Sequence, residues 1–398
     1  MKKGLVLLIS ILCLNITLKA QIDFIDRYEE LNTITTAVPF LIISPDAKAG
    51  GMGDVGVAST PDAMSMHWNP AKYAFVDDQA GVAVCYTPWL KSLIPDIDLS
   101  YLSGYTKRND NEAFAFALRY FTLGEIKFTD NSGNSLGSFN PNELAFSSTY
   151  ARKLTDNMST AIALRYIYSN LTGGQQVGTL PTEAGQSIAG DVAAFYTKPI
   201  RLGSQNANLS IGLNISNIGS KIAYTETTTR DFIPTNMRFG TAVTTAIDKY
   251  NKISFEVDFN KLLVPTPPIY NDGEIIAGMN PDVSVMSGVF QSFGDAPGGA
   301  KEELREIIYS LGSEYWYDEQ FAVRAGYFHE APTKGDRQFF SLGAGLRYNV
   351  FGLDFSYLIP VRSRDEAGAV NPLSNTLRFA LTFDFGALKE QAIIPNEG

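Results

Sequence analysis

The sequence predicts an all-β fold, a transmembrane antiparallel β-barrel of fourteen strands preceded by an N-terminal plug segment. Three observations predict it. From Ala80 to Phe385, stretches of roughly ten residues alternate apolar and polar side chains, as barrel strands do. Short and longer connections follow one another between these stretches, and the chain begins with an export signal. This combination is typical of barrels in the bacterial outer membrane.

Residues 1–20 have the pattern of a secretory signal peptide. Lys2 and Lys3 precede an apolar run, Gly4 to Leu14, that is too short to span a bilayer. Cleavage is predicted after Ala20. It removes one of the two cysteines and leaves Cys85 alone, so no disulfide is expected.

The charge of the chain is acidic. The full sequence has a formal net charge of −10 from 32 basic and 42 acidic residues, and removing the signal takes away three lysines and no acid. Nucleic-acid binding needs clustered Lys and Arg, so no nucleic-acid partner is expected. The 25 Phe and 19 Tyr residues suit the aromatic girdles of a barrel embedded in outer-membrane lipid.

Residues 21–79 do not alternate like strands and are rich in Gly, Ala, Met and Asp. We expect this segment to fill the lumen or its periplasmic mouth. The barrel is predicted over residues 80–385 and a periplasmic tail over 386–398. The predicted strands are 80–89, 96–106, 112–123, 142–153, 157–170, 187–199, 206–216, 235–246, 250–261, 304–316, 319–329, 337–349, 351–361 and 374–385.

The connections orient the barrel. Barrels of this kind turn tightly in the periplasm and carry their long loops outside the cell. An even number of strands then places both termini in the periplasm, with the long loops extracellular. The prediction is therefore an outer-membrane protein of fixed orientation.

Inward-facing positions carry small or charged side chains of both signs. Two interpretations are open: a lumen neutralised by internal ion pairs, or a selective path for ions or solutes. The charged residues predicted to face inward include Arg119, Arg165, Arg238, Glu256, Asp258, Arg324, Asp354, Arg378 and Asp384.

The longest loop, 262–303, has an apolar centre, and loops of this length usually have a function. It either folds over the barrel mouth and buries Val285, Val289 and Phe293, or presents its apolar side chains to a protein partner. The partner-binding candidates are Val283, Val285, Met286, Val289, Phe290 and Phe293.

Motifs for catalysis do not combine into a site. Residues 51–56 match G-x-G-x-x-G, but Pro45 and Pro61 exclude the strand and helix that a dinucleotide site requires, so tight packing is the expected role. His67 is predicted to be packed or hydrogen-bonded, and His329 to be a solvated loop residue. A surface enzyme acting on lipopolysaccharide through His329 is the weakest hypothesis. We expect no catalytic residue, cofactor or metal.

The N-terminal segment carries one usable signature, a glycine-rich start followed by Asp-Ala-x-Ser and Asn-Pro-Ala. It resembles the hatch of the long-chain fatty-acid transporter (FadL) superfamily, whose barrels have fourteen strands. Within that superfamily the sequence is more similar to the PorV family of type IX secretion proteins. The plug-motif residues are Gly51, Gly53, Asp54, Gly56, Asp62, Ser65, Asn69 and Pro70.

The resemblance implies a non-enzymatic accessory or shuttle protein. Its implied partners are the translocon barrel of the type IX system (SprA, also called Sov), the C-terminal signal domains of secreted cargo, and the surface attachment complex containing the PorU sortase. The alternative that remains open is a FadL-like transporter of hydrophobic small molecules across the outer membrane.

Overall fold

The computed structural model describes residues 31–94, 96–129, 132, 134–174, 181–203, 205–225, 230–364 and 370–386. The predicted signal peptide and residues 387–398 of the predicted tail lie outside these ranges.

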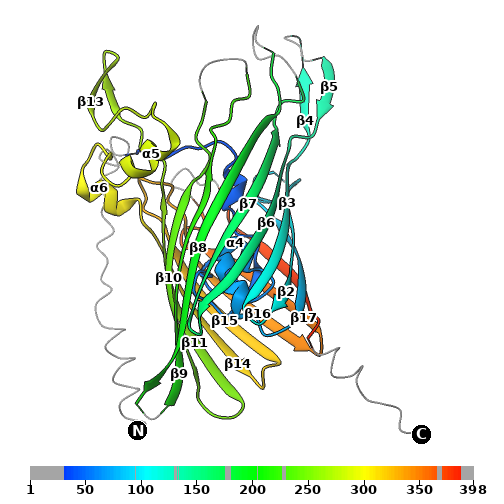
Figure 1. Cartoon of the computed structure of the whole chain (residues 1–398). Helices are drawn as coiled ribbons and strands as arrows, with labels where there is room; N and C mark the ends of the chain where they lie inside the picture. Colours follow the sequence, from blue (N-terminus) through cyan, green and yellow to red (C-terminus); the bar gives the residue numbers. More distant parts are fainter. Residues whose placement is uncertain are drawn as a thin grey trace.

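Fourteen antiparallel strands close into a barrel, as predicted (Figure 1). Each strand pairs with its neighbours along the chain, and β1 closes the barrel by pairing with β18 through registers such as Gly81 with Asp384. The barrel strands are β1 (Ala80–Pro88), β2 (Ile97–Asn109), β3 (Glu112–Leu123), β6 (Asn142–Thr155), β7 (Met158–Asn170), β8 (Gly185–Leu202), β9 (Gln205–Gly219), β10 (Asn236–Ala246), β11 (Asn251–Leu262), β14 (Ile308–Tyr317), β15 (Phe321–His329), β16 (Gln338–Tyr348), β17 (Phe351–Pro360) and β18 (Leu377–Asp384).

The predicted boundaries are wrong at a few strand ends. β2 and β8 run further into the tight turns than predicted, because the backbone ladder continues there, and β9 continues to Gly219 at the loop end. Leu304 and Arg305, predicted in a strand, belong to the helix α6 (Ala300–Arg305). Glu302 and Glu303 in the first turn of α6 and Arg305 in its last turn suit the helix dipole.

The connections at one end of the barrel contain secondary structure that the sequence did not predict. β4 (Ile126–Thr129) pairs with β5 (Ser135–Phe139), and β12 (Ile269–Asn271) pairs with β13 (Glu274–Ala277). Figure 1 shows these hairpins at the same end as α5 (Val285–Gln291) and α6. Among the described residues, no helix has the length and apolar character needed to cross a membrane.

The two faces of the strands differ as the alternation predicts. On β16, Phe340 and Leu342 are exposed on the outer face, whereas Ser341 between them is buried inside. The inner wall of β1, β3, β6 and β7 is largely alanine, which leaves room in the lumen for other chain segments. The buried wall alanines of these strands are Ala83, Ala113, Ala115, Ala117, Ala145, Ala151, Ala161 and Ala163.

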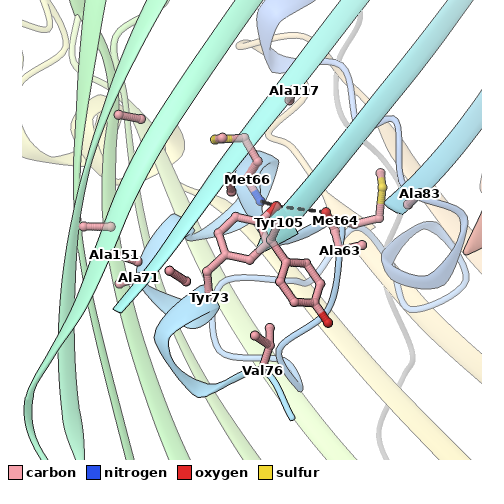
Figure 2. Close-up of a cluster of buried hydrophobic side chains, with 14 of the residues drawn as sticks. Ala63, Met64, Met66, Ala71, Tyr73, Val76, Ala83, Tyr105, Ala117 and Ala151 are labelled. Atoms are coloured by element: carbon pink, nitrogen blue, oxygen red, sulfur yellow. Dashed lines mark hydrogen bonds between the residues drawn. The ribbon is translucent and has the colours of Figure 1, made fainter. Parts of the chain in front are cut away.

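The N-terminal segment, residues 31–79, packs against this alanine wall (Figures 1 and 2). It contains η1 (Pro39–Ile42), α3 (Ala47–Gly50), α4 (Ser65–Trp68) and η2 (Pro70–Phe75). Figure 2 shows Tyr73 within a cluster of the segment's apolar side chains and strand alanines. The Tyr73 hydroxyl accepts from the Met66 amide over 3.0 Å and donates to the Ala63 carbonyl over 2.8 Å.

Several charged side chains inside the barrel form ion pairs, and others bond to backbone groups. Arg324 is 2.7 Å from Glu314 and 2.8 Å from Asp354, and Arg165 is 2.9 Å from Asp191. These pairs agree with the first interpretation of the lumen, internal neutralisation, because buried charges are retained where they find partners.

Candidate functional site

The glycine-rich part of the N-terminal segment lies directly against the barrel wall. A Cβ on Gly51 would meet the Cα of Gly343 at 2.8 Å, and a Cβ on Gly53 would meet the backbone of Tyr327 at 2.6 Å. Gly53 also has a φ of +73°, which favours glycine. Gly51 and Gly53 therefore serve close backbone packing on β15 and β16, and a Cβ on Gly56 would clash with the Trp68 ring. This geometry is not that of a dinucleotide site.

The polar residues that follow reach other strands. Asp54 forms an ion pair with Arg378 of β18. One carboxylate oxygen of Asp258, on β11, accepts from the amides of Gly56 (2.7 Å) and Val57 (3.0 Å). Successive residues of one short segment are thus held by strands that are far apart in the sequence.

The second half of the plug motif shapes the segment itself. Asp62 accepts from the Met64 amide over 2.9 Å and pairs with Lys48 at 2.9 Å. Burial alone would raise the pKa of Asp62, but Lys48 and Lys72 outweigh it and hold that pKa at about 2. The hydroxyl of Ser65 accepts from the Asp62 amide over 3.1 Å.

Asn69 and Pro70 connect α4 to η2. The Asn69 amide group donates to the carbonyl of Val57 over 3.1 Å and to that of Ala194, on β8, over 2.9 Å. The Asn69 side-chain oxygen caps η2 by accepting from the Ala71 amide over 3.0 Å, and Pro70 occupies its first turn. The structure therefore assigns the plug-motif residues to packing and capping.

The histidines do not form a catalytic set. His67 lies between two arginines, with its Nδ1 2.7 Å from Arg119 and its carbonyl 2.6 Å from Arg238. Burial, followed by the charges of Arg238 and Arg119, lowers the pKa of His67 well below its usual value, so the ring is neutral. His329 ends β15, in agreement with the predicted strand 319–329, but it is half-buried beside Tyr309 and Tyr327 rather than solvated.

Among the described residues, no group of three or more His, Cys, Asp or Glu side chains could hold a metal ion. Lys72, which the sequence did not single out, is fully buried and donates over 2.8 Å to both the Gly56 carbonyl and the Ser59 hydroxyl. A buried lysine between a backbone carbonyl and a hydroxyl has no sequence signature of its own.

The long loop after β11 presents apolar side chains on two of its elements. Phe290, Met286 and Phe293, in or beside α5, are 72%, 53% and 51% exposed. Val283, Val285 and Val289 are half-buried. One face of the loop is therefore partly covered by the protein itself, and the other presents its apolar side chains to the outside. We call the exposed set the apolar rim. It consists of Ile269, Tyr270, Ile275, Ile276, Met279, Met286, Phe290 and Phe293.

Half of the apolar rim lies on the β12–β13 hairpin, which sequence analysis missed. Its turn, Asp272-Gly273, has positive φ at both residues (46° and 86°). Asp-Gly is a favoured turn of tight hairpins, and here apolar residues flank it on both sides. That signal could have located the hairpin within the loop.

The base of the loop is held by a buried charge network. Glu306, just after α6, contacts Lys261 at 2.5 Å and Lys334 at 3.0 Å. Lys261 also contacts Glu303 at 3.0 Å, and Lys334 contacts Glu302 at 2.6 Å. Because these side chains are nearly or fully buried, the network fixes α6 on the barrel end.

A closed barrel with alternating faces and an inner charge network defines this chain as an outer-membrane β-barrel protein. The family model described as "Type IX secretion system protein PorV" matches residues 26–269, more than half of the chain. The chain belongs to the PorV family. This match confirms the resemblance carried by the plug motif and the strands.

The chain is also similar to solved barrels. With the toluene transporter TbuX of Ralstonia pickettii it shares 10% identity at a TM-score of 0.46, over 85% of this chain and 97% of that chain. With a FadL homologue of Pseudomonas aeruginosa it shares 13% identity at a TM-score of 0.43, over 89% and 99%. No curated protein sequence matches the chain.

Proposed function

We propose that this protein is a non-enzymatic accessory component of type IX protein secretion in the outer membrane. It binds the SprA/Sov-type translocon barrel and the C-terminal signal domains of cargo, and passes cargo to the PorU-type attachment complex. The family match supports the secretion system. The observation that carries the binding role is the apolar rim, because large exposed apolar patches on a folded protein mark interaction sites.

In this proposal the two ends of the barrel have different tasks. The end with the tight turns and the end of β18 faces the periplasm, and the end with α5, α6 and the two hairpins faces the outside. The described N-terminal segment starts at this outer end, where Asn32 donates to the Pro267 carbonyl and to Glu302, over 3.0 Å each. The N-terminal segment is the plug. Its contacts with β8, β11 and β18 support this role, since they hold it across the lumen rather than at one wall.

The anchored base of the loop supports binding by the apolar rim. A surface held in place loses less conformational freedom on association than a mobile one. The network of Lys261, Lys334 and Glu306 fixes the base, while the apolar side chains stay exposed. The rim is thus prepared to receive an apolar surface of a protein partner.

The test is a set of charged substitutions in the apolar rim. A Met286→Asp/Phe290→Asp/Phe293→Asp variant should lose translocon co-purification and cargo export while the barrel still folds. Deletion of residues 283–293 should give the same result. Ile126→Asp, on the exposed β4–β5 hairpin, is the matched control and should retain both activities. Retention of both by the triple variant would remove the rim from the proposal.

The secretion role itself has a separate test. Cells lacking the protein should fail to export cargo that bears the C-terminal signal domain, and native protein purified from outer membranes should carry the translocon. Normal export without the protein would refute the secretion role, whichever residues form the rim.

Transport of hydrophobic small molecules is the second candidate. One observation favours it: a cavity inside the barrel is lined by aromatic side chains together with charged ones. The aromatic members are Trp68, Trp89, Phe328 and Phe339, and the charged ones are Asp54, Arg238 and Arg337. The volume of this cavity is only about 70 Å³, whereas ligand sites usually measure roughly 300–1,000 Å³. Hydrophobe uptake that depends on the protein, together with normal secretion in its absence, would favour transport.

A further inference from the structure

The outer wall of the barrel has a groove on β2, β3, β6 and β7. It measures about 650 Å³ and is lined by residues that include Phe114, Phe116, Ser148, Ile162 and Leu164. It lies outside the lumen, well away from the apolar rim. None of the roles proposed above uses it.

The strand register explains why the wall is hollow at this place. Outward-facing residues form rows across neighbouring strands, and one row runs Gly104, Phe116, Ser148, Leu164 and Gly190. Small and large side chains therefore alternate along this row. A Cβ on Gly104 would meet the Phe116 ring at 3.0 Å, so that ring lies over Gly104 and leaves Ser148 uncovered.

The rows on either side close the groove. Toward the loop end, the next row is Leu118, Phe146 and Tyr166, with no small residue among them. Toward the tight turns, Tyr150 packs against Phe114 with ring centroids 5.3 Å apart. Ser148 is therefore the floor of a bounded apolar groove on a surface that faces membrane.

Beyond the row of Phe114 and Tyr150, toward the tight turns, the same outer wall carries positive charge. Arg108 and Arg152 are 66% and 59% exposed there, and they share the carboxylate of Glu112 at 3.3 Å and 3.9 Å. Two guanidinium groups with one carboxylate leave a net positive charge and several free N–H donors. Tyr150 also donates to Glu112 over 2.9 Å, which holds that carboxylate beside the arginines.

The spacing of these groups matches a lipid. Ser148 and Arg152 lie four residues apart on β6, about 13 Å along the strand, which is about 10 Å of membrane depth for a strand tilted by about 40°. One leaflet of a bilayer has a hydrocarbon depth of roughly 15 Å. An acyl chain seated over Ser148 would thus place its headgroup phosphate near Arg108 and Arg152.

We propose that this groove binds an anionic glycerophospholipid of the leaflet at the tight-turn end, with an acyl chain over Ser148 and the phosphate on Arg108 and Arg152. The inference rests on the membrane orientation proposed above. It does not rest on secretion, because lipid binding is measured on the purified protein.

The test is a titration of the purified full chain in detergent with phosphatidylglycerol or phosphatidylethanolamine, read by native mass spectrometry. Phosphatidylglycerol should bind more tightly. Arg108→Gln and Arg152→Gln should each weaken phosphatidylglycerol binding about fivefold and change phosphatidylethanolamine binding little. Arg201→Gln, an exposed arginine at the same end of β8, is the control and should change neither.

Filling the groove tests the chain site separately. Ser148→Leu should weaken both lipids about tenfold, with Ser148→Val as a milder variant. Ala344→Leu, on the exposed outer face of β16, should have no effect. The proposal would be overturned if the two lipids bound equally well and the arginine substitutions did not change phosphatidylglycerol binding. So would variants that leave lipid binding intact but abolish co-purification of a protein, because the groove would then be a protein docking face.

A separate measurement with lipid A tests the orientation. If the native protein retains lipid A in this groove, the tight turns face outside, and the orientation fails along with the phospholipid assignment. Loss of lipid binding in the variants with normal cargo export would leave the proposed secretion function untouched.

Discussion

Lys261 and Glu306 join the two ends of the longest loop: the ammonium nitrogen of Lys261 lies 2.5 Å from a carboxylate oxygen of Glu306. Lys261 is near the end of β11, and Glu306 directly follows α6. The second carboxylate oxygen of Glu306 accepts from Lys334 and from the hydroxyl of Thr266. One buried carboxylate thus ties together the start of the loop, its last helix and the neighbouring connection.

Glu306→Gln should therefore loosen the loop and leave the barrel intact. The substitution keeps the shape but leaves two buried ammonium groups with less compensation, at a cost of about 1–3 kcal/mol for the anchored loop. Limited proteolysis should cut the 262–303 region faster, while the barrel still shows its heat-dependent shift in gel electrophoresis. Glu274→Gln, an exposed glutamate of the same loop, should not change the rate. Equal rates for both variants would contradict the anchoring role.

The same network predicts a pH dependence. Burial would raise the pKa of Glu302, but its hydrogen bond and charge interaction with Lys334 outweigh burial, and the pKa lies below its ordinary 4.5. Near these pKa values, Glu302 therefore binds fewer protons in the anchored loop than in the released loop. Its stabilisation by Glu302 is complete above pH 4.5 and declines as the pH falls through the folded pKa.

The protection factors of the α6 amides, which correct for the intrinsic pH dependence of exchange, should consequently stay constant between pH 7 and 5 and fall below that. Asp295 has the opposite effect on the pH dependence, because burial raises its pKa. The contribution of Glu302 is therefore obtained by subtracting the result for Glu302→Gln from that for the wild type. The difference between the wild type and Glu302→Gln should vanish at low pH. A difference that stays constant down to pH 3 would show that Glu302 does not titrate with release of the loop.

Gly53 provides a test of the N-terminal segment. Gly53→Ala combines positive φ, which costs an alanine about 1–2 kcal/mol, with a clash against the Tyr327 backbone. The segment should shift away from the wall. Cys85 is a built-in reporter, since it is buried on β1 with its sulfur 3.6 Å from that of Met64. Maleimide labelling of Cys85 in the folded protein should become faster.

Gly273→Ala separates strain from the clash. Gly273 also has positive φ, at 86°, but nothing lies within 4 Å of its Cβ position. This variant should label like the wild type. If Gly53→Ala labels no faster than Gly273→Ala, close packing at Gly53 is not what holds the segment.

The barrel could be predicted because the sequence features that specify it are local. Period-two alternation and tight-turn residues specify each strand and its inner face, and the register follows from short hairpins. Apolar residues at 283–293 were also visible in the sequence. Their division between exposed Phe290 and half-buried Val289 was not, because it depends on where α5 packs.

The anchoring network could not be predicted for the same physical reason. Lys261, Glu306 and Lys334 are far apart in the sequence, and each resembles an ordinary surface charge in its local context. The groove at Ser148 depends on the register of four strands, which a single-strand pattern does not contain. Residues that act across strands become visible only when the barrel is closed.

The ion pair of Asp54 with Arg378 offers the sharpest energetic test of the plug. Both side chains are nearly buried, and Arg378 is a strand residue while Asp54 belongs to the N-terminal segment. Removing either partner leaves a buried charge alone, so Asp54→Asn or Arg378→Gln should each cost about 3–5 kcal/mol of unfolding free energy. The double variant removes both charges and should cost clearly less than the sum, with a coupling energy of about 2 kcal/mol. Urea unfolding in detergent micelles, followed by tryptophan fluorescence, measures the free energy of unfolding of the wild type, the two single variants and the double variant.

Asp336 and Arg362 provide the matched cycle. They form an ion pair of 3.1 Å in the connections at the loop end, with side chains that are 39% and 46% exposed. Solvent screens such a pair, so the coupling in Asp336→Asn/Arg362→Gln should fall below about 1 kcal/mol. A buried pair that couples no more strongly than this exposed one would mean that Asp54 is solvated in the membrane-embedded protein, and that the N-terminal segment does not seal the lumen beside β18.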